Sequence, residues 1–410
     1  MNLFCDNVDK TIESAFEEAQ SERLVITILV CGGTGVGKSS LIRTMFDLDV
    51  PVSHSRPCTQ NFEEYATDRI RVIDSRGHEK GETVTQFIIS LREFVAGKKS
   101  KASRVGDRIN LIWYLIDAPG ARLTDGDKET IKELEALCGR ERVFIVLSKC
   151  DVARQAQISN LFAALDAECG IGGNRIVPIC DEVGKEDDRT PENVKKGLDI
   201  LLERSLAILP ELEKEQMMLS QKIDFEIRIE AIKNLRKKTQ NYILPALASS
   251  IGAAFIPIPG TGTVIITSAQ AVMIGKLASL YSITYSTKVF LPILSSILGR
   301  ITTRELLKLV PVVGNAINAG VAAAFTSAIA LYCIDSFEKI AIARALGEPY
   351  RDFTFDAGKL NEYIKQAYEH LSPFKKRKSK VDDGFTEEEN TALKDFIEKP
   401  RNVDGLSFLL

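Results

Sequence analysis

The sequence has 410 residues, which is more than one ordinary domain needs, so we expect two or three domains with separate cores. A formal net charge of -3 excludes a chain that binds nucleic acid through an overall basic surface. The eight cysteines form no C-x-x-C pair and have no histidine at metal-ligand spacing, which fits reduced thiols in a cytosolic compartment. The N-terminus lacks the apolar segment of a secretion signal, so we expect a cytoplasmic protein.

The first half of the chain alternates predicted strands with predicted helices. A short helix is expected within residues 1–23, followed by a buried strand at residues 24–30 that ends in a glycine-rich turn. Further strands are predicted at residues 61–67, 70–74, 109–116, 143–147 and 175–178. This βαβ pattern predicts a mostly parallel sheet flanked by helices over residues 24–208.

The second half of the chain is predicted to be helical. Residues 209–238 are highly charged and suit a linking helix. Long stretches with few charges predict an apolar helical domain over residues 239–370. A basic segment and a terminal helix are expected over residues 371–410, where Thr386 and Glu389 have the spacing of a capping box.

A phosphate-binding loop is predicted at residues 32–39, which match G-x-x-x-x-G-K-[ST] between a strand and a helix. The glycines let backbone amides curl around phosphate groups, and the following helix directs its positive N-terminal end toward the same anion. We expect the Lys38 ammonium to neutralise the β- and γ-phosphates, and the Ser39 hydroxyl to bind Mg²⁺. The expected nucleotide contacts here are Gly33, Thr34, Gly35, Val36, Gly37, Lys38, Ser39 and Ser40.

A base-reading loop is predicted directly after the strand at residues 143–147, at the sheet edge where open α/β folds bind ligands. The carboxylate of Asp151 can accept hydrogen bonds from both N1–H and N2–H of guanine, whereas adenine offers no such pair of donors on that edge. Lys149 is expected to lay its aliphatic stem along the purine. The stretch resembles the [NT]KxD motif of GTPases, with Ser148 in place of Asn or Thr, and implies GTP and GDP as ligands.

Two stretches, residues 74–77 and 117–120, match the D-x-x-G motif that senses the γ-phosphate in such GTPases. In these proteins two strands follow the motif, counting the strand that delivers the base-reading aspartate. Two predicted strands follow Asp74, whereas one follows the second stretch. We therefore expect Asp74 to reach Mg²⁺ through water and the Gly77 amide to bind the γ-phosphate. Residues 117–120 are instead predicted to form a turn before a helix capped by Thr124.

Residues 52–60 are predicted to be a mobile switch loop. By resemblance to GTPases generally, Thr59 is expected to be a second Mg²⁺ ligand. His78 has the position of the catalytic Gln of Ras-like proteins and could orient the attacking water, while Arg56 resembles the internal arginine of heterotrimeric G-protein α subunits. With Lys38 these two are the candidate catalytic residues. An ordinary loop residue is the alternative for Thr59, His78 and Arg56.

Taken together, the motifs resemble the Era/TrmE-like P-loop GTPases of bacteria over about residues 24–208. The resemblance implies an α/β P-loop GTPase domain followed by an all-α domain. Residues 256–260 and 310–314 share a β-branched/Pro/β-branched/x/Gly pattern, each before a small-residue helix. These helix starts resemble those of an uncharacterised helical domain that is often fused to such GTPases.

The sequence does not decide whether the helical domain is soluble or attached to a membrane. Residues 309–334 form a run of 26 residues without charge, which is long enough to span a bilayer but rich in small residues. A buried soluble domain and attachment at the inner face of the cell membrane both fit this pattern. Basic clusters within residues 98–104 and 375–380 suit an anionic membrane surface or a solvated linker. Self-association is a further candidate interaction. Ribosomal RNA is a less favoured partner, because no aromatic residues are interleaved with the basic ones.

The leading functional hypothesis is a GTP-hydrolysing switch, in which GTP and Mg²⁺ order residues 52–60 and the segment after Asp74. The change would reach the helical domain through residues 209–238. A membrane-associated scaffold with negligible hydrolysis is one alternative, and an ATP-using P-loop enzyme is another.

Overall fold

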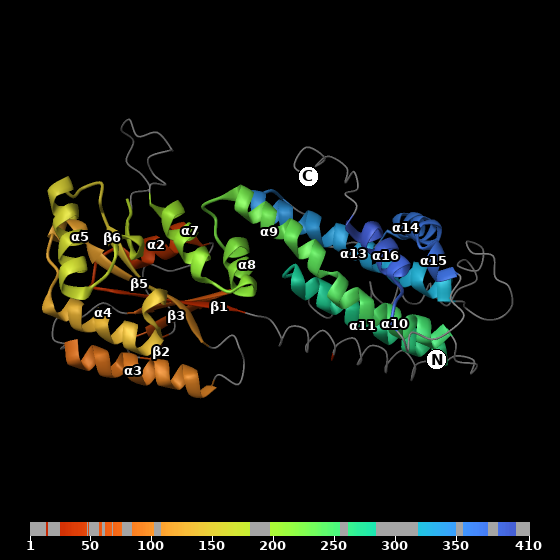
Figure 1. The fold of residues 1–410 in the computed structure, drawn as a ribbon, viewed down its shortest axis with the longest axis horizontal. Coiled ribbons are helices and arrows are strands. Elements are labelled where there is room, and N and C mark those ends of the chain that lie inside the picture. The colour runs from red at the N-terminus through yellow and green to blue at the C-terminus, as the bar shows by residue number, and fades with distance from the viewer. Residues whose placement is uncertain are drawn as a thin grey trace. The chain divides into compact units, whose positions relative to one another are not determined.

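The computed structural model describes residues 14, 25–46, 48, 57–59, 62–67, 69–75, 84–101, 108–180, 197–254, 261–283, 319–349, 356–375 and 384–398. The chain divides into two compact units, Leu24–Arg228 and Met1–Arg23 with Ile229–Leu410. Figure 1 shows their described elements.

The first unit is built on a seven-stranded sheet with the order β2-β3-β4-β1-β5-β6-β7. Parallel pairing joins β4, β1, β5, β6 and β7, while β2 and β3 are antiparallel to their neighbours. The predicted fold class is therefore confirmed. The strands are β1 Ile26–Gly32, β2 Pro57–Thr59, β3 Phe62–Ala66, β4 Ile70–Ser75, β5 Ile109–Asp117, β6 Val143–Ser148 and β7 Ile176–Pro178.

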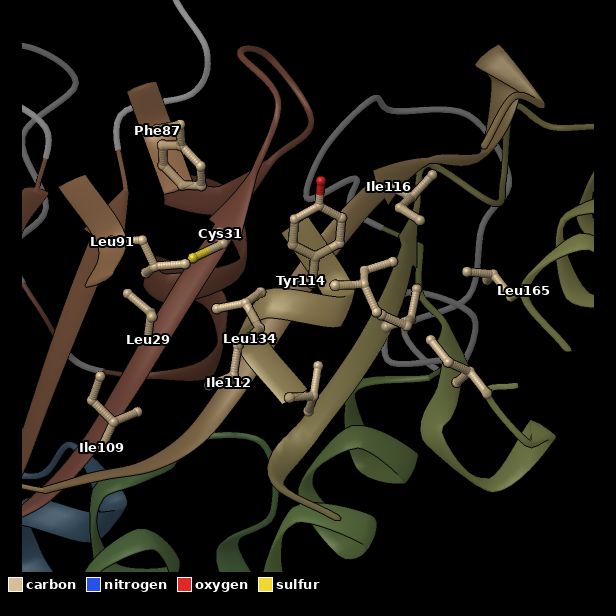
Figure 2. Packing of buried hydrophobic residues seen from close by; sticks show 14 of the residues in the cluster. Leu29, Cys31, Phe87, Leu91, Ile109, Ile112, Tyr114, Ile116, Leu134 and Leu165 are labelled. Carbon is tan, nitrogen blue, oxygen red and sulfur yellow. The ribbon is translucent and has the colours of Figure 1, made fainter. Parts of the chain in front are cut away.

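Helices bury the central strands from both faces, as their nearly continuous apolar sequences require. On one face, Leu29 of β1 and Ile112 of β5 share a core with residues of three helices, among them Leu134 (Figure 2). On the other face, the rings of Trp113 in β5 and Phe46 stack with their centroids 5.8 Å apart. The Trp113 indole N–H donates to the hydroxyl of Ser205, which lies in a fourth helix. The helices are α2 Lys38–Met45, α3 Val84–Lys101, α4 Asp125–Cys138, α5 Gln155–Cys169, α7 Leu198–Ile208 and α8 Glu211–Ser220.

The predicted linking helix over residues 209–238 is wrong in one respect, because the structure has two helices there, α8 and α9 (Phe225–Lys238). The side chain of Gln221 forms the break. Its Oε1 accepts hydrogen bonds from the backbone amides of Ile223 and Asp224 at 2.7 and 2.8 Å. These bonds replace helical ones. Helix α8 contacts β1 and β4 and so belongs to the α/β unit. The break was not predicted because residues 211–238 contain no glycine and no proline to mark it.

The second unit is helical. Its described helices, besides the end of α9, are α10 Gln240–Ala254, α11 Thr261–Leu280, α13 Ala319–Leu346, α14 Ala357–His370, α15 Ser372–Lys375 and α16 Glu387–Glu398. The predicted capping box is confirmed, because the Glu389 amide donates to Thr386 Oγ1 at 3.2 Å and the Thr386 amide to Glu389 at 3.0 Å. The repeats at residues 256–260 and 310–314 and most of the second basic cluster lie outside the described residues.

Helix α13 lies at the centre of this unit and contacts α10, α11, α14 and α15. Among the described helices it alone has the length and composition to cross a membrane, with a mean hydropathy of 1.5 over its most apolar window. However, 89% of that window is buried inside the protein, as in the core helix of a soluble domain.

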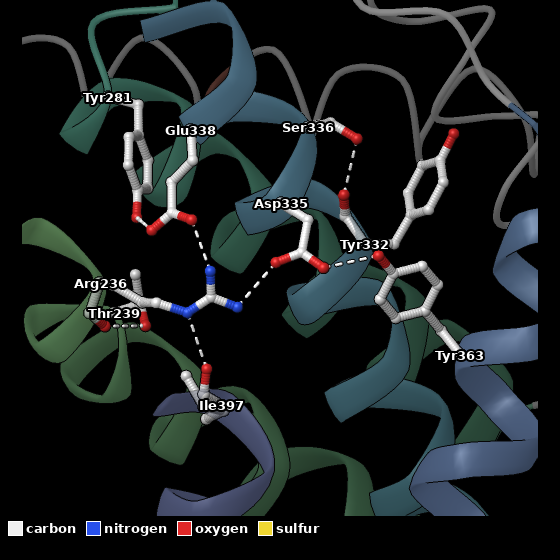
Figure 3. Close-up of polar contacts among 9 residues, drawn as sticks. All are labelled: Arg236, Thr239, Tyr281, Tyr332, Asp335, Ser336, Glu338, Tyr363 and Ile397. Carbon is white, nitrogen blue, oxygen red and sulfur yellow. Dashed lines mark hydrogen bonds and ion pairs between the residues drawn. The ribbon is translucent and has the colours of Figure 1, made fainter. Parts of the chain in front are cut away.

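A buried ionic cluster joins α13 to helices around it (Figure 3). Arg236 of α9 contacts Asp335 at 2.7 Å and Glu338 at 2.5 Å, and both carboxylates are nearly inaccessible to solvent. The hydroxyls of Tyr281 and Tyr363 donate to Glu338 and Asp335 at 3.1 and 2.5 Å. Burial raises the pKa of Glu338 to about 7, although the nearby Arg236 guanidinium lowers it. Two acids thus share one guanidinium in the core.

Candidate nucleotide-binding site

The glycine-rich loop lies between β1 and α2 and has a conformation that depends on its glycines. Gly35 and Gly37 have φ values of +78° and +98°, in the left-handed region that disfavours other residues. Gly32 has φ +142°, and a Cβ there would lie 2.5 Å from the carbonyl oxygen of Leu115. The loop therefore packs against the end of β5 at a distance that excludes a side chain at position 32.

Lys38 begins α2 and is almost fully buried. Its ammonium donates to the carbonyl oxygens of Gly32 and Gly33 at 3.1 and 2.9 Å. Burial lowers the pKa of Lys38, while the Asp74 carboxylate acts in the opposite direction. The loop thus already holds a positive charge at the N-terminal end of a helix, where an anion is favoured.

Ser39 and Asp74 form the second part of the site. The Ser39 hydroxyl donates to Asp74 Oδ2 at 3.0 Å, and Asp74 Oδ1 is buried with no hydrogen-bond partner among the described residues. Burial raises the pKa of Asp74 to about 6, against the opposing effects of Lys38 and Ser39. One buried carboxylate oxygen without a partner next to a hydroxyl is a donor set that suits a hard cation such as Mg²⁺.

The base-reading loop follows β6 as predicted. Lys149 has φ +56° and its ammonium donates to the carbonyl oxygen of Gly35 at 2.7 Å. The amide of Cys150 donates to Ile179, just after β7, at 3.1 Å. Ser148 ends β6, and its hydroxyl donates to the end of β5 rather than into the site. Asp151 lies half-buried in the turn that follows.

The structure brings the phosphate loop, Asp74 and the base-reading loop to one edge of the sheet, where β1, β4 and β6 end. Within the loop Thr34 is exposed and Val36 is buried, and Ser40 is half-buried in α2. Arg56, Gly77 and His78 lie outside the described residues, so their predicted roles stay predictions.

The switch-loop prediction for residues 52–60 is wrong at its end, where residues 57–59 form strand β2. Thr59 lies opposite Phe62 in an antiparallel pair with β3. The composition indicated a loop, but pairing with a neighbouring strand decides this conformation, and three residues are too few for a recognisable period. Only the backbone of Thr59 is described, so its role as a ligand stays a prediction.

The stretch 117–120 is the turn that the sequence predicted, with a 3-10 helix η2 at Ala118–Gly120 before the Thr124-capped helix α4. Its aspartate nevertheless has a second role that we did not predict. Asp117 Oδ1 lies 2.9 Å from the Lys149 ammonium. The strand order offered a signal, because β5 and β6 are parallel neighbours and their ends meet at the same edge.

Comparison with known proteins assigns most of the α/β unit's sheet to a protein family. Residues 27–149 match the family described as 50S ribosome-binding GTPase. The chain contains a P-loop GTPase domain. The match ends at residue 149, so the resemblance of the helical unit to a domain fused to GTPases stays a prediction.

Three known proteins are similar to parts of this chain that include the GTPase domain. GTP-binding protein A of Dictyostelium discoideum is 33% identical over 103 residues, which cover 22% of this chain and 23% of that protein. The tRNA modification GTPase MnmE of Geobacter sulfurreducens is 29% identical over 150 residues, covering 35% and 30%. The chain thus spans less than a third of these relatives. A crystal structure of a probable GTP-binding protein, engB, matches at 18% identity and a TM-score of 0.33, covering 44% of this chain and 98% of that one.

Proposed function

We propose that this protein binds guanine nucleotide with Mg²⁺ and hydrolyses GTP to GDP and phosphate as a conformational switch acting on its helical domain. The observation that carries the proposal is the bond between the Lys149 ammonium and the Gly35 carbonyl oxygen. It ties the base-reading loop to the phosphate loop, so that one nucleotide can reach both.

Each part of the site has a role in this proposal. Backbone amides of the phosphate loop would hold the phosphates, and the Lys38 ammonium, which donates to two loop carbonyls, would also donate to phosphate oxygens. Mg²⁺ would be held by Ser39, by Thr59 and, through water, by Asp74, and supplies positive charge that offsets the phosphates. The Gly77 amide would contact the γ-phosphate.

Asp151 selects guanine in this proposal, because its carboxylate accepts two hydrogen bonds that adenine cannot donate. ATP should therefore compete poorly with GTP for the wild-type protein, and Asp151→Asn should weaken GTP binding more than ATP binding. Equal competition by ATP would refute the choice of base and favour an ATP-using enzyme.

Hydrolysis is tested by the rate of GTP turnover. Wild type should release phosphate from GTP in the presence of Mg²⁺, and Lys38→Ala should not, because it removes the charge that stabilises the transferred phosphoryl group. Lys132→Ala is a matched control, since this lysine is exposed on α4, a helix that contains none of the candidate site residues. His78→Ala and Arg56→Ala should each lower the turnover rate while leaving GDP affinity nearly unchanged.

A second candidate is a nucleotide-dependent scaffold with negligible hydrolysis at the inner face of the cell membrane, which α13 would suit by its length and hydropathy if its buried apolar window became exposed. Centrifugation with vesicles of anionic lipid, with GTP or GDP bound, tests it. Recovery of the protein in the soluble fraction under both conditions would refute this candidate and leave a cytoplasmic switch. Turnover of GTP that depends on Lys38 would also refute it, because this candidate is defined by negligible hydrolysis.

A further inference from the structure

The carboxylate of Asp117 is the charged group at the site that the proposed function leaves unused. It ends β5, where the register with β6 places Asp117 opposite Ser148. Its Oδ1 is shielded from solvent and lies 2.9 Å from the Lys149 ammonium. The carboxylate makes no capping hydrogen bond to the helix η2 that follows, so a role in the turn does not explain it.

Lys149 connects this carboxylate to the phosphate loop. Its ammonium lies between Asp117 and the carbonyl oxygen of Gly35, which it reaches at 2.7 Å. The lysine backbone is in the left-handed region, with φ +56°, and Gly35 has φ +78°. A left-handed lysine is unfavourable by itself, so contacts of its side chain and of the following turn must keep it there.

We propose that Asp117 is a positioning residue for guanine nucleotide, an inference that rests on the proposed function. Asp117 acts through Lys149: it holds the ammonium on Gly35 and thereby fixes the base-reading loop relative to the phosphate loop before a nucleotide arrives. Because the loops are then already placed, less freedom is lost on binding. Removing the carboxylate should weaken GDP and GTP to the same degree, since both carry the same base.

The test is a double-mutant cycle on the dissociation constant of a fluorescent GDP analogue. Asp117→Asn should raise Kd about fivefold, the size expected for a partly exposed ion pair. In a Lys149→Met background the same substitution should change Kd little, because the group through which Asp117 acts is gone. Asp117→Glu, which keeps the charge, should restore most of the affinity.

Asp125→Asn is the matched control, because Asp125 forms a 2.9 Å ion pair with Lys128 on α4 and should leave Kd unchanged. The emission of Trp113, which is the one tryptophan and lies in β5, verifies that each variant is folded. An unchanged Kd in Asp117→Asn, or an equal loss in the Lys149→Met background, would overturn the positioning role and leave the proposed function standing. A wild-type protein that binds no GDP would overturn both.

Discussion

The Ser39 hydroxyl donates a hydrogen bond to Asp74 Oδ2 at 3.0 Å, which joins the first turn of α2 to the end of β4 across 35 residues of sequence. The bond leaves Asp74 Oδ1 buried and without a hydrogen-bond partner among the described residues. Two motifs that are separate in the sequence thus place the Ser39 hydroxyl and the Asp74 carboxylate side by side.

Ser39→Ala should weaken Mg²⁺-dependent nucleotide binding by at least about tenfold, because it removes a hydroxyl ligand and frees the Asp74 carboxylate to reorient. The measurement is GDP affinity with Mg²⁺ and with a chelator. Thr44→Ala is a matched control on the same helix, since its hydroxyl donates to the carbonyl oxygen of Ser40. A loss of similar size with and without Mg²⁺ would contradict the metal-ligand role.

Arg236→Met should destabilise the helical unit by at least about 3 kcal/mol, because it leaves Asp335 and Glu338 buried without their countercharge. The guanidinium also donates to the carbonyl oxygen of Ile397 at 2.8 Å, so α16 loses a contact too. Urea unfolding followed by circular dichroism measures the change. Arg92→Met should cost much less, because the pair that Arg92 forms with Glu133 is at the surface. Equal losses would contradict a special role for the buried cluster.

Stability should fall as pH rises from 6 to 8. The pKa of Glu338 is raised to about 7 from 4.5, so the folded state binds its proton more tightly than the unfolded chain does. This contribution is complete below pH 4.5 and is lost as pH passes through 7, which amounts to about 1 kcal/mol between pH 6 and 8. The measurement is the free energy of unfolding in urea at both values.

Glu338→Gln is the control for the pH effect, since it keeps the shape of the side chain and removes its titration. Asp74, with its pKa raised to about 6, adds a change of the same sign in both proteins. The difference between wild type and variant therefore isolates Glu338. A difference that does not vary with pH would refute the shift.

Gly197→Ala should destabilise the GTPase domain by more than about 1 kcal/mol, because the glycine has φ +101° and a Cβ would lie 2.0 Å from the carbonyl oxygen of Pro178. The clash is with backbone and cannot be relieved by a rotamer change. Gly173→Ala is the matched control, since its Cβ would meet nothing within 4 Å. Unfolding in urea followed by Trp113 emission compares them, and equal midpoints would contradict the clash.

Features that depend on neighbours in the chain could be predicted from the sequence. Alternation of strands and helices predicted the mostly parallel sheet, and the spacing of residues 32–39 placed the phosphate loop between β1 and α2. The caps at Thr124 and Thr386 were predicted for the same reason, because a side chain that accepts from an amide three residues later is a local interaction.

Contacts between distant segments needed the tertiary structure. Whether Asp117 reaches Lys149, or Arg236 meets Asp335 and Glu338, depends on which strands and helices become neighbours. The sequence placed a nucleotide site at one sheet edge and left open how its loops are held. Only the folded chain, by bringing the ends of β5 and β6 together, decided that Asp117 faces Lys149, because side-chain pairing follows strand order and not sequence distance.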